Sequence, residues 1–393
     1  MSAAAEPNAA SFYSGLEVAL GVLVAGLTLV LMGVQPILVG FYSDHLHLDL
    51  SQNGWVLAAE QFGGAAGALL GYWISTRMRW SYSIIGSCVL AAAVNVVTAY
   101  LTGFDALLVA RFVSGLTSTA AYTVAIYFLA QTAKPERVFG ILMVLQTTFF
   151  SIDAMILPPL NERYGYGVAV GSASLWFVAA LFAAFWLPAG IDSQNRPAAA
   201  HQRQAGARPL VGAAALLGAF LLQLSIFAVW GFLERIGRGN GLSDEQIGYA
   251  IGIGVLGGIP GGLLPAVIGE RFGRLSMVVL SGVLLVASYV ALAGMLHMTA
   301  YLLWIGVMNV GWVLGLAYYM GLTVRHDPDG RMTRLMPFAQ ILSAGVGPAC
   351  SALATGDQQL APIFVIACAA ATLGVVLVLA ASAVRARDPA LIS

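Results

Sequence analysis

The chain consists of long apolar runs that alternate with short polar segments. An apolar run of about 20 residues is long enough for an α-helix to cross ~30 Å of hydrocarbon. Twelve such runs can be read along the chain, so we predict an all-α membrane protein with twelve transmembrane helices. The predicted limits are 14–40, 52–75, 81–102, 106–131, 138–160, 167–188, 210–233, 246–268, 275–296, 299–322, 334–355 and 360–383.

One connection differs from the others. Segment 189–209, between the sixth and seventh predicted helices, is rich in Pro, Ala, Gln and Arg, a composition typical of a flexible interdomain loop. The chain is therefore predicted to divide into an N-terminal six-helix bundle at 1–188, this cytoplasmic loop, and a C-terminal six-helix bundle at 210–393. Because no Lys or Arg precedes the first apolar run, we do not expect a signal peptide there.

The two predicted bundles share a sequence pattern at an offset of 194 residues. The matching residues are Gly63 with Gly257, Gly67 with Gly261, Arg77 with Arg271, and Arg137 with Arg331. A repeat of six spans, an even number, gives both bundles the same orientation in the membrane, as in transporters whose parallel halves enclose a site near the midplane. The glycines four residues apart are interpreted first as positions of close helix packing.

Composition narrows the class of protein. Charged residues make up 9% of the chain, hydrophobic residues 59%, and the mean hydropathy is +0.85, whereas a soluble domain carries about 25% charge. Lipid is therefore the main solvent, and a net charge of zero argues against nucleic acid as a partner. We find no Walker motif, no reactive cluster and no metal-ligand spacing, so we expect no enzyme activity, no cofactor and no metal.

Basic residues concentrate in alternate loops. Fourteen of the 18 Lys and Arg residues fall on one side, and Arg163, Arg235 and Arg238 fall on the other. Since cytoplasmic loops carry the excess of Lys and Arg, we expect an inner-membrane protein with both termini and the middle loop in the cytoplasm.

Three ionisable residues of the N-terminal half lie deep in predicted spans. At 1.5 Å per residue, Arg111 is ~9 Å inside the fourth span, and Glu60 and Asp153 are ~14 Å inside the second and fifth. Intramembrane charges usually face a cavity and pair with one another, so one acid is expected to pair with Arg111 while the other accepts a proton. The pattern does not say which acid pairs, and a static salt bridge remains an alternative to proton coupling.

A fourth candidate for proton coupling is Glu234, near the outer end of the seventh span. Arg238 follows it at the (i, i+4) spacing of an ion pair on a helix surface. The pair is predicted to be either a surface contact or a part of an outer gate.

Several local motifs resemble those of the major facilitator superfamily. In span four, Arg111-Phe-Val-Ser-Gly115 is similar to an Arg-xxx-Gly element of that family, and in span one Gly33-Val-Gln-Pro36 is similar to its Pro-containing element. The loop after span eight, 266–274, resembles the family's loop motif, although Ala266 stands where Gly is usual. The loop after span two, 71–79, resembles a degraded copy in which Ser75 stands where Asp is usual. The resemblance implies a gating role for Arg77, Arg79, Glu270, Arg271 and Arg274.

The resemblance also implies which helices surround the solute. In this family, spans one, four, seven and ten line the central cavity, and in this chain their polar and aromatic residues are Gln35, Tyr122, Tyr127, Gln223, Trp230, Asn309, Trp312 and Tyr319. Tyr and Trp offer an apolar face with one polar group, which suits an aromatic or amphipathic organic solute. The same residue types also populate interfacial belts and helix contacts.

We therefore predict a secondary active transporter of a small organic solute, coupled to protons and working as a monomer by alternating access in the lipid bilayer. A proton-driven efflux antiporter is one alternative, although span five, 149–159, lacks the family's Gly-rich antiporter motif. A flippase for lipids or lysolipids is another. A membrane-embedded enzyme and a sensor without flux are further classes that the pattern does not favour.

Overall fold

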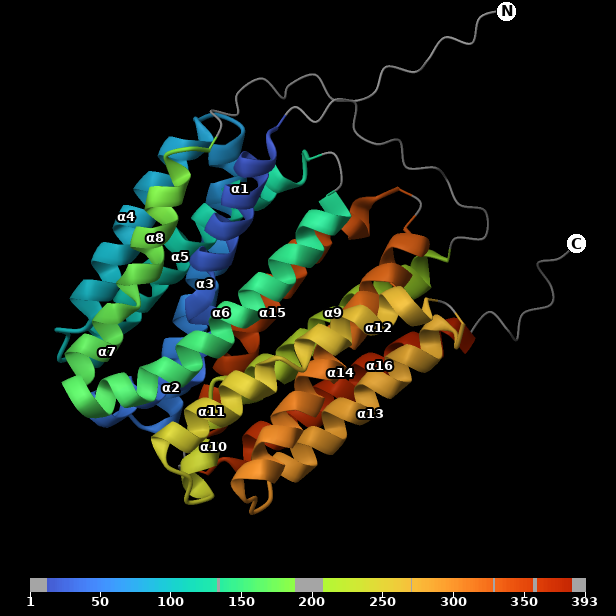
Figure 1. The fold of residues 1–393 in the computed structure, drawn as a ribbon. Helices are drawn as coiled ribbons and strands as arrows, with labels where there is room; N and C mark the ends of the chain where they lie inside the picture. The colour runs from blue at the N-terminus through green and yellow to red at the C-terminus, as the bar shows by residue number, and fades with distance from the viewer. Residues whose placement is uncertain are drawn as a thin grey trace, which may run out of the picture.

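The computed structural model describes residues 13–132, 135–187, 208–269, 271–327, 329–355 and 359–383, and every regular element in these ranges is a helix (Figure 1). The first half contains α1 Gly15–Thr28, α2 Val30–Leu46, α3 Leu50–Ser75, α4 Trp80–Thr98, α5 Phe104–Leu129, α6 Pro135–Tyr164, α7 Tyr166–Ser172 and α8 Ser174–Ala184. The second half contains α9 Pro209–Trp230, α10 Leu233–Gly239, α11 Asp244–Val255, α12 Gly258–Ile268, α13 Arg274–Leu292, α14 Met298–Arg325, α15 Arg331–Ala354 and α16 Ala361–Ala383.

The predicted all-α membrane fold is confirmed. Among the described residues, eleven helices are long and apolar enough to cross a membrane, and α1 with α2 counts as one of them. The remaining predicted span is α3, which has 26 residues and therefore sufficient length. Its apolar content is lower because it carries Glu60 and Gln61 near its middle.

Three spans that were predicted as continuous helices are interrupted. The first breaks at Leu29, where Thr28 donates its hydroxyl to the Val24 and Ala25 carbonyls at 2.9 and 3.3 Å, a local bond that competes with the helix ladder. The span 246–268 breaks between α11 and α12, and Pro260 then lies in the first turn of α12, where proline is tolerated. The sixth span breaks at Ala173.

The repeated glycines place helix backbones in direct contact. A Cβ on Gly63 would lie 2.0 Å from the Phe112 carbonyl oxygen, so α3 packs against the backbone of α5. At the repeat offset, a Cβ on Gly257 would lie 2.3 Å from the Gly306 oxygen, at the boundary between α11 and α12 where they face α14. Close packing is therefore what these glycines provide in both halves.

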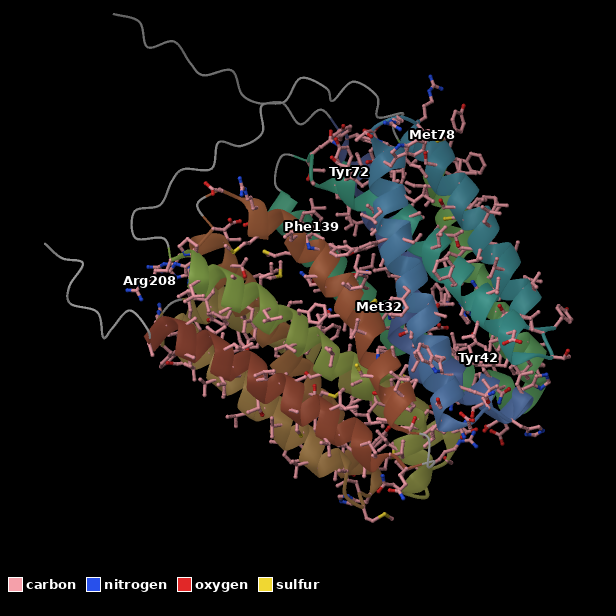
Figure 2. All side chains as sticks on the ribbon, turned by 180° about the vertical axis from the view of Figure 1, so that it is seen from behind. Met32, Tyr42, Tyr72, Met78, Phe139 and Arg208 are labelled. Atoms are coloured by element: carbon pink, nitrogen blue, oxygen red, sulfur yellow. The ribbon has the colours of Figure 1, made fainter. Side chains whose placement is uncertain are left out.

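The two halves meet mainly toward one end of the molecule. We call it the Asp44 end, after the residue near the end of α2, and we call the opposite end, between α3 and α4, the Arg77 end. A Cβ on Gly54 of α3 would lie 2.7 Å from the Ala352 Cβ of α15, and one on Gly248 of α11 would lie 2.6 Å from a carbonyl oxygen of α6. Toward the Arg77 end the two bundles diverge (Figures 1 and 2).

Candidate functional site

A buried ion pair joins α5 to α3 inside the first half. The Arg111 guanidinium Nη2 lies 3.0 Å from Glu60 Oε1, and the two side chains are 0% and 11% exposed. The backbones of these helices are close enough for this pair because position 115 is glycine: a Cβ there would lie 1.9 Å from the Glu60 carbonyl oxygen. Glu60, and not Asp153, is therefore the ion-pair partner of Arg111 in this structure.

The other donors of Arg111 are bound within the protein. Its Nη1 donates to the Tyr42 hydroxyl at 2.7 Å and to Asn95 Oδ1 at 3.1 Å, and its Nη2 also donates to the Ser114 hydroxyl. Its Nε is buried and has no hydrogen-bond partner among the described residues. Three neighbouring helices, α2, α3 and α4, therefore bind the guanidinium, and Ser114 of its own helix binds it as well. The Arg111 side chain is completely buried.

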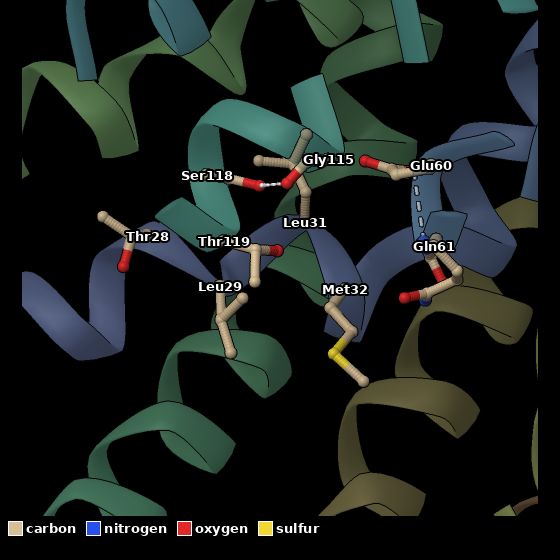
Figure 3. A pocket seen from close by; sticks show the side chains of 10 residues that line it. Thr28, Leu29, Leu31, Met32, Glu60, Gln61, Gly115, Ser118 and Thr119 are labelled. Carbon is tan, nitrogen blue, oxygen red and sulfur yellow. Dashed lines mark hydrogen bonds between the residues drawn. The ribbon is translucent and has the colours of Figure 1, made fainter. Parts of the chain in front are cut away.

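A chain of side-chain amides continues from Glu60. Gln35 Nε2 donates to Glu60 Oε2 at 3.1 Å, and Gln61 Nε2 donates to Gln35 Oε1 at 3.1 Å. All three side chains border a pocket beside the break at Leu29 (Figure 3). Its lining residues are Thr28, Leu29, Leu31, Met32, Gln35, Glu60, Gln61, Gly115, Ser118 and Thr119.

Asp153 occupies a separate environment. It lies on α6, is 4% exposed and accepts a hydrogen bond from the Trp176 side chain of α8. Its Oδ2 is buried and finds no hydrogen-bond partner in the part of the chain that the structure describes. In this conformation Asp153 is therefore the acid that does not pair with Arg111.

A second ion cluster crosses the boundary between the halves at the Asp44 end. Glu234 of α10 is bound by the Nε atoms of Arg235, at 2.7 Å, and of Arg238. Arg235 Nη2 donates to Asp44 Oδ1 of α2 at 2.8 Å and to the Gly40 carbonyl at 2.7 Å. Glu234 is therefore part of a contact between α2 and α10 and not a pair on an isolated helix surface.

This cluster holds three acids against two arginines. Burial raises the pKa of Glu234 to about 7, and the nearby Asp44 and Asp244 act in the same direction, while Arg235 and Arg238 lower it. With Glu234 ionised the five side chains sum to one negative charge, and with Glu234 protonated they sum to zero. The cluster can therefore exchange a proton near neutral pH.

The residues predicted to line the cavity are dispersed. Gln35 borders the pocket, and Trp230 donates its indole N–H to the Met32 carbonyl at 3.2 Å, across the boundary between the halves. In the second half, Trp312 donates to Gln223 Oε1, and the Asn309 amide donates to a carbonyl of its own helix at 2.9 Å.

The three predicted tyrosines have packing contacts away from that pocket. Tyr127 packs edge-on against Trp80, with ring centroids 5.9 Å apart. Tyr122 is hydrogen-bonded with the Gln146 side chain, and Tyr319 is buried between α9 and α16.

The predicted gating arginines contact groups of their own half. Arg77 lies over the Trp73 ring at 4.6 Å and Arg79 over Tyr82 at 5.8 Å. Arg274 donates to the Gly321 carbonyl at 3.2 Å, and Arg271 is exposed. Glu270 lies outside the described residues.

Comparison with known proteins is consistent with this geometry. The model of the Major Facilitator Superfamily matches residues 18–336. The chain belongs to this superfamily. Members move solutes across membranes, so the chain is a multi-pass membrane transporter.

Two curated relatives match parts of the chain. The arabinose-proton symporter of Escherichia coli (strain K12) is 32% identical over 122 residues, which are 30% of this chain and 26% of that protein. The galactose-proton symporter of the same strain is 26% identical over 150 residues, which are 38% of this chain and 31% of that protein. The matches thus span less than a third of these relatives.

Solved structures match the fold over nearly the whole chain. The nucleoside transporter NupG covers 94% of this chain and 99% of its own, with a TM-score of 0.68 and 14% identity. An auto-inhibited peptide transporter of the POT family covers 94% and 97%, with a TM-score of 0.69 and 13% identity. At these identities the likeness concerns the fold alone.

Sequence reasoning missed several residues of the site. Gln61 and Ser114 had local signals, because Gln61 follows Glu60 directly and Ser114 lies one helical turn after Arg111. Tyr42, Asn95 and the pairing of Asp44 with α10 had none, since these residues are distant in sequence from their partners.

Proposed function

We propose that the chain is a secondary active transporter that couples movement of a small organic solute to protons by alternating access. The observation that carries this proposal is the Arg111–Glu60 pair, because Glu60 borders the polar pocket and also neutralises a buried cation. Intramembrane charges facing a cavity are functional candidates by default. The two proton symporters among the relatives support the same coupling ion.

The proposed coupling step is a proton that binds to Glu60. Protonation converts the carboxylate to a neutral acid and removes the charge that holds Arg111, while Tyr42, Asn95 and Ser114 keep the guanidinium solvated. A proton can shift a conformational equilibrium only if the two states bind it differently. Glu60 satisfies that condition if its pairing with Arg111 differs between the states.

Asp153 and Glu234 are proposed as secondary proton sites. A buried carboxyl group with no cation beside it is stable mainly in its neutral form, which describes Asp153. Glu234 belongs to the contact between the halves at the Asp44 end, so we assign the cluster around it the role of a gate. The arginines at the Arg77 end, with Glu270, are proposed to form a corresponding gate when that end closes.

The orientation follows from the distribution of basic residues. With both termini and the middle loop in the cytoplasm of the inner membrane, the Asp44 end faces outward and the conformation described here is open toward the inside. We expect a monomer. Of the eight candidate residues, Gln35 borders the pocket, and Trp230 and Trp312 are proposed to offer aromatic faces to the solute.

The test is solute-dependent proton movement in proteoliposomes that contain a pH-sensitive dye. Organic acids, aromatics, sugars, amphiphilic drugs and lysolipids form the panel. We expect at least one solute to drive protons in its own direction, whereas protons moving in the opposite direction would indicate an efflux antiporter. Flux of solute without any proton movement would contradict the coupling, and flip of lysolipid alone would indicate a flippase.

A further inference from the structure

Helix α2 carries a proline in the middle of a membrane-spanning segment. Pro36 lies inside the helix and is buried. A proline has no backbone N–H, so it cannot bind the carbonyl of the residue four positions before it, and its ring pushes against that carbonyl. In α2 that residue is Met32. The Met32 carbonyl therefore lacks its usual partner within its own helix, and away from water it needs a donor from elsewhere.

This donor comes from the other half of the molecule. The Trp230 indole N–H, at the end of α9, donates to the Met32 carbonyl at 3.2 Å. Trp230 is 4% exposed, and Met32 lies between the two bundles (Figure 2). The next residue, Gly231, allows this approach, since a Cβ there would lie 2.1 Å from Leu57 Cδ1 of α3. The end of α9 is thus packed against the first half at the carbonyl that Pro36 leaves free.

The sequence repeat explains why these two residues meet. Trp230 stands at the offset of 194 residues from Pro36, so it holds the equivalent position in the second half. Equivalent positions of two parallel halves lie at the same depth in the membrane. The halves differ here, because α9 contains proline only at its first residue, Pro209. One half therefore offers a carbonyl without a helix donor, and the other half offers an N–H.

A proline at the boundary does not produce such a bond by itself. Pro158 of α6 removes the helix donor of the Ala154 carbonyl in the same way. That oxygen lies near Gly248 of α11, where a Cβ would be 2.6 Å from it, and glycine has no side-chain donor. The indole of Trp230 is therefore the feature that makes a hydrogen bond between the halves at Met32.

We infer that the Trp230 indole N–H locks the Asp44 end in its closed state by supplying the hydrogen bond that Pro36 removes from Met32. Trp230 is thus a positioning residue of the transport cycle. When the halves separate, this bond breaks and water can reach the carbonyl. If the halves closed without the indole N–H, the carbonyl would lose that water and gain no donor, which opposes closure. The inference rests on the alternating access of the proposed function, and it adds a residue that acts through the backbone of α2.

Labelling of a cysteine at the closed end, without solute and without a pH gradient, tests the lock. Ala352→Cys, in the full chain without its three native cysteines and reconstituted in liposomes, reports opening because Ala352 packs against Gly54 of α3. Trp230→Phe keeps an aromatic ring and removes the N–H. One hydrogen bond corresponds to about a tenfold change in an equilibrium constant, so labelling should become roughly tenfold faster.

Two further variants assign the effect to the hydrogen bond. Pro36→Ala returns an N–H to the Met32 carbonyl within α2, so Trp230→Phe should change labelling by less than about twofold in that background. Trp80→Phe removes the indole bond to the Ser75 carbonyl, which is 2.9 Å long and lies within the first half. This control should lower the unfolding temperature and leave the labelling rate unchanged.

An unchanged labelling rate in Trp230→Phe would overturn the inference. So would equal acceleration in Trp80→Phe, which would indicate a general loss of packing, or full acceleration in the Pro36→Ala background. If Trp230→Phe folds neither alone nor together with Pro36→Ala, the ring and not the N–H is the required group, which also overturns it. Absence of solute-dependent proton movement in vesicles would contradict the proposed coupling and would leave the labelling result unaffected.

Discussion

The two buried ion clusters differ in their place relative to the boundary between the halves. The Arg111–Glu60 pair joins α5 and α3 within one half, and its closest helix contacts are backbone against backbone at Gly115. The cluster around Glu234 joins α10 to α2 through the pairs of Arg235 and Arg238 with Asp44, and these two pairs require the halves to touch at the Asp44 end. A group within one half can sense a proton or a solute, whereas a group between the halves senses the conformation.

The charge balance differs in the same way. Arg111 and Glu60 sum to zero, while the cluster at the Asp44 end carries one acid in excess. Protonation of Glu60 therefore leaves an unpaired cation, whereas protonation of Glu234 neutralises its cluster. Acid is therefore expected to weaken the Arg111–Glu60 pair and to stabilise the cluster around Glu234.

The largest expected effect comes from Arg111→Ala. It removes the partner of Glu60, and loss of one member of a buried ion pair typically costs about 3–5 kcal/mol. We expect a large drop in the temperature of thermal unfolding and loss of uptake. The control is Arg163→Ala, which removes an arginine stacked on Tyr164. If uptake by Arg111→Ala is within twofold of uptake by this control, the Arg111–Glu60 pair is not required for transport.

Gly115→Ala should break the same site through its backbone. The new Cβ would lie 1.9 Å from the Glu60 carbonyl oxygen, so α3 must move away from α5. Overpacking of this kind costs about 1–3 kcal/mol. The temperature of thermal unfolding and the rate of uptake should both fall. Gly140→Ala, whose Cβ meets nothing within 4 Å, should leave both unchanged. Equal behaviour of the two variants would argue against close contact of α3 and α5.

Glu234 should make closure of the Asp44 end depend on pH. Its pKa is raised to about 7 in the closed cluster from an ordinary value of 4.5. The closed state therefore binds the proton more tightly than a state in which Glu234 is exposed. Protonation of Glu234 therefore stabilises the closed state of the Asp44 end. This stabilisation is complete below about pH 4.5 and is lost as the pH rises through about 7.

Labelling of an introduced cysteine measures this closure. Ala352→Cys, in a chain without its three native cysteines, should react more slowly at pH 5.5 than at pH 8.5, by roughly the thirtyfold that the 1.5 units between pH 5.5 and a pKa of about 7 represent. Rates are referred to an exposed Glu245→Cys at the same end. Glu234→Gln imitates the protonated group, so its labelling should be slow at both pH values; an undiminished pH dependence in that variant would rule out Glu234 as the cause.

The smallest expected effect is that of Tyr42→Phe. The change removes one acceptor from Arg111 Nη1 and leaves Asn95 Oδ1 in place. A single hydrogen bond contributes about 1 kcal/mol, so the unfolding temperature should fall slightly and proton coupling should survive. Tyr82→Phe on the exposed face of α4 is the reference, and loss of coupling in Tyr42→Phe would show that the hydroxyl acts in the proton step.

Much of the fold could be predicted from the sequence because lipid imposes simple rules. Apolar length located the spans, and glycines at the repeat offset marked positions of close helix packing. The structure shows that their partners are α5 for the glycines of α3 and α14 for those of α12. The one predicted span that is not among the eleven helices long and apolar enough to cross a membrane, α3, is also the one that carries Glu60. The weakest membrane signal therefore marked a functional candidate.

The pairing of charges could not be predicted. Glu60 and Asp153 lie at equal estimated depth, and depth does not tell which way a side chain points around its helix axis. The rotation that turns Glu60 toward Arg111 follows from packing at Gly63 and Gly115. The closed state of the Asp44 end is not encoded as a fixed feature either, because one sequence must allow both conformations of an alternating transporter.

The most direct test of the central claim is Glu60→Gln in proteoliposomes, with solute counterflow and proton-driven accumulation measured side by side. The amide keeps the shape of the side chain but cannot be deprotonated. If Glu60 carries the coupled proton, counterflow should continue while accumulation driven by a pH gradient disappears. Accumulation at the wild-type rate and with the wild-type pH dependence would contradict the claim and leave Arg111–Glu60 as a structural pair.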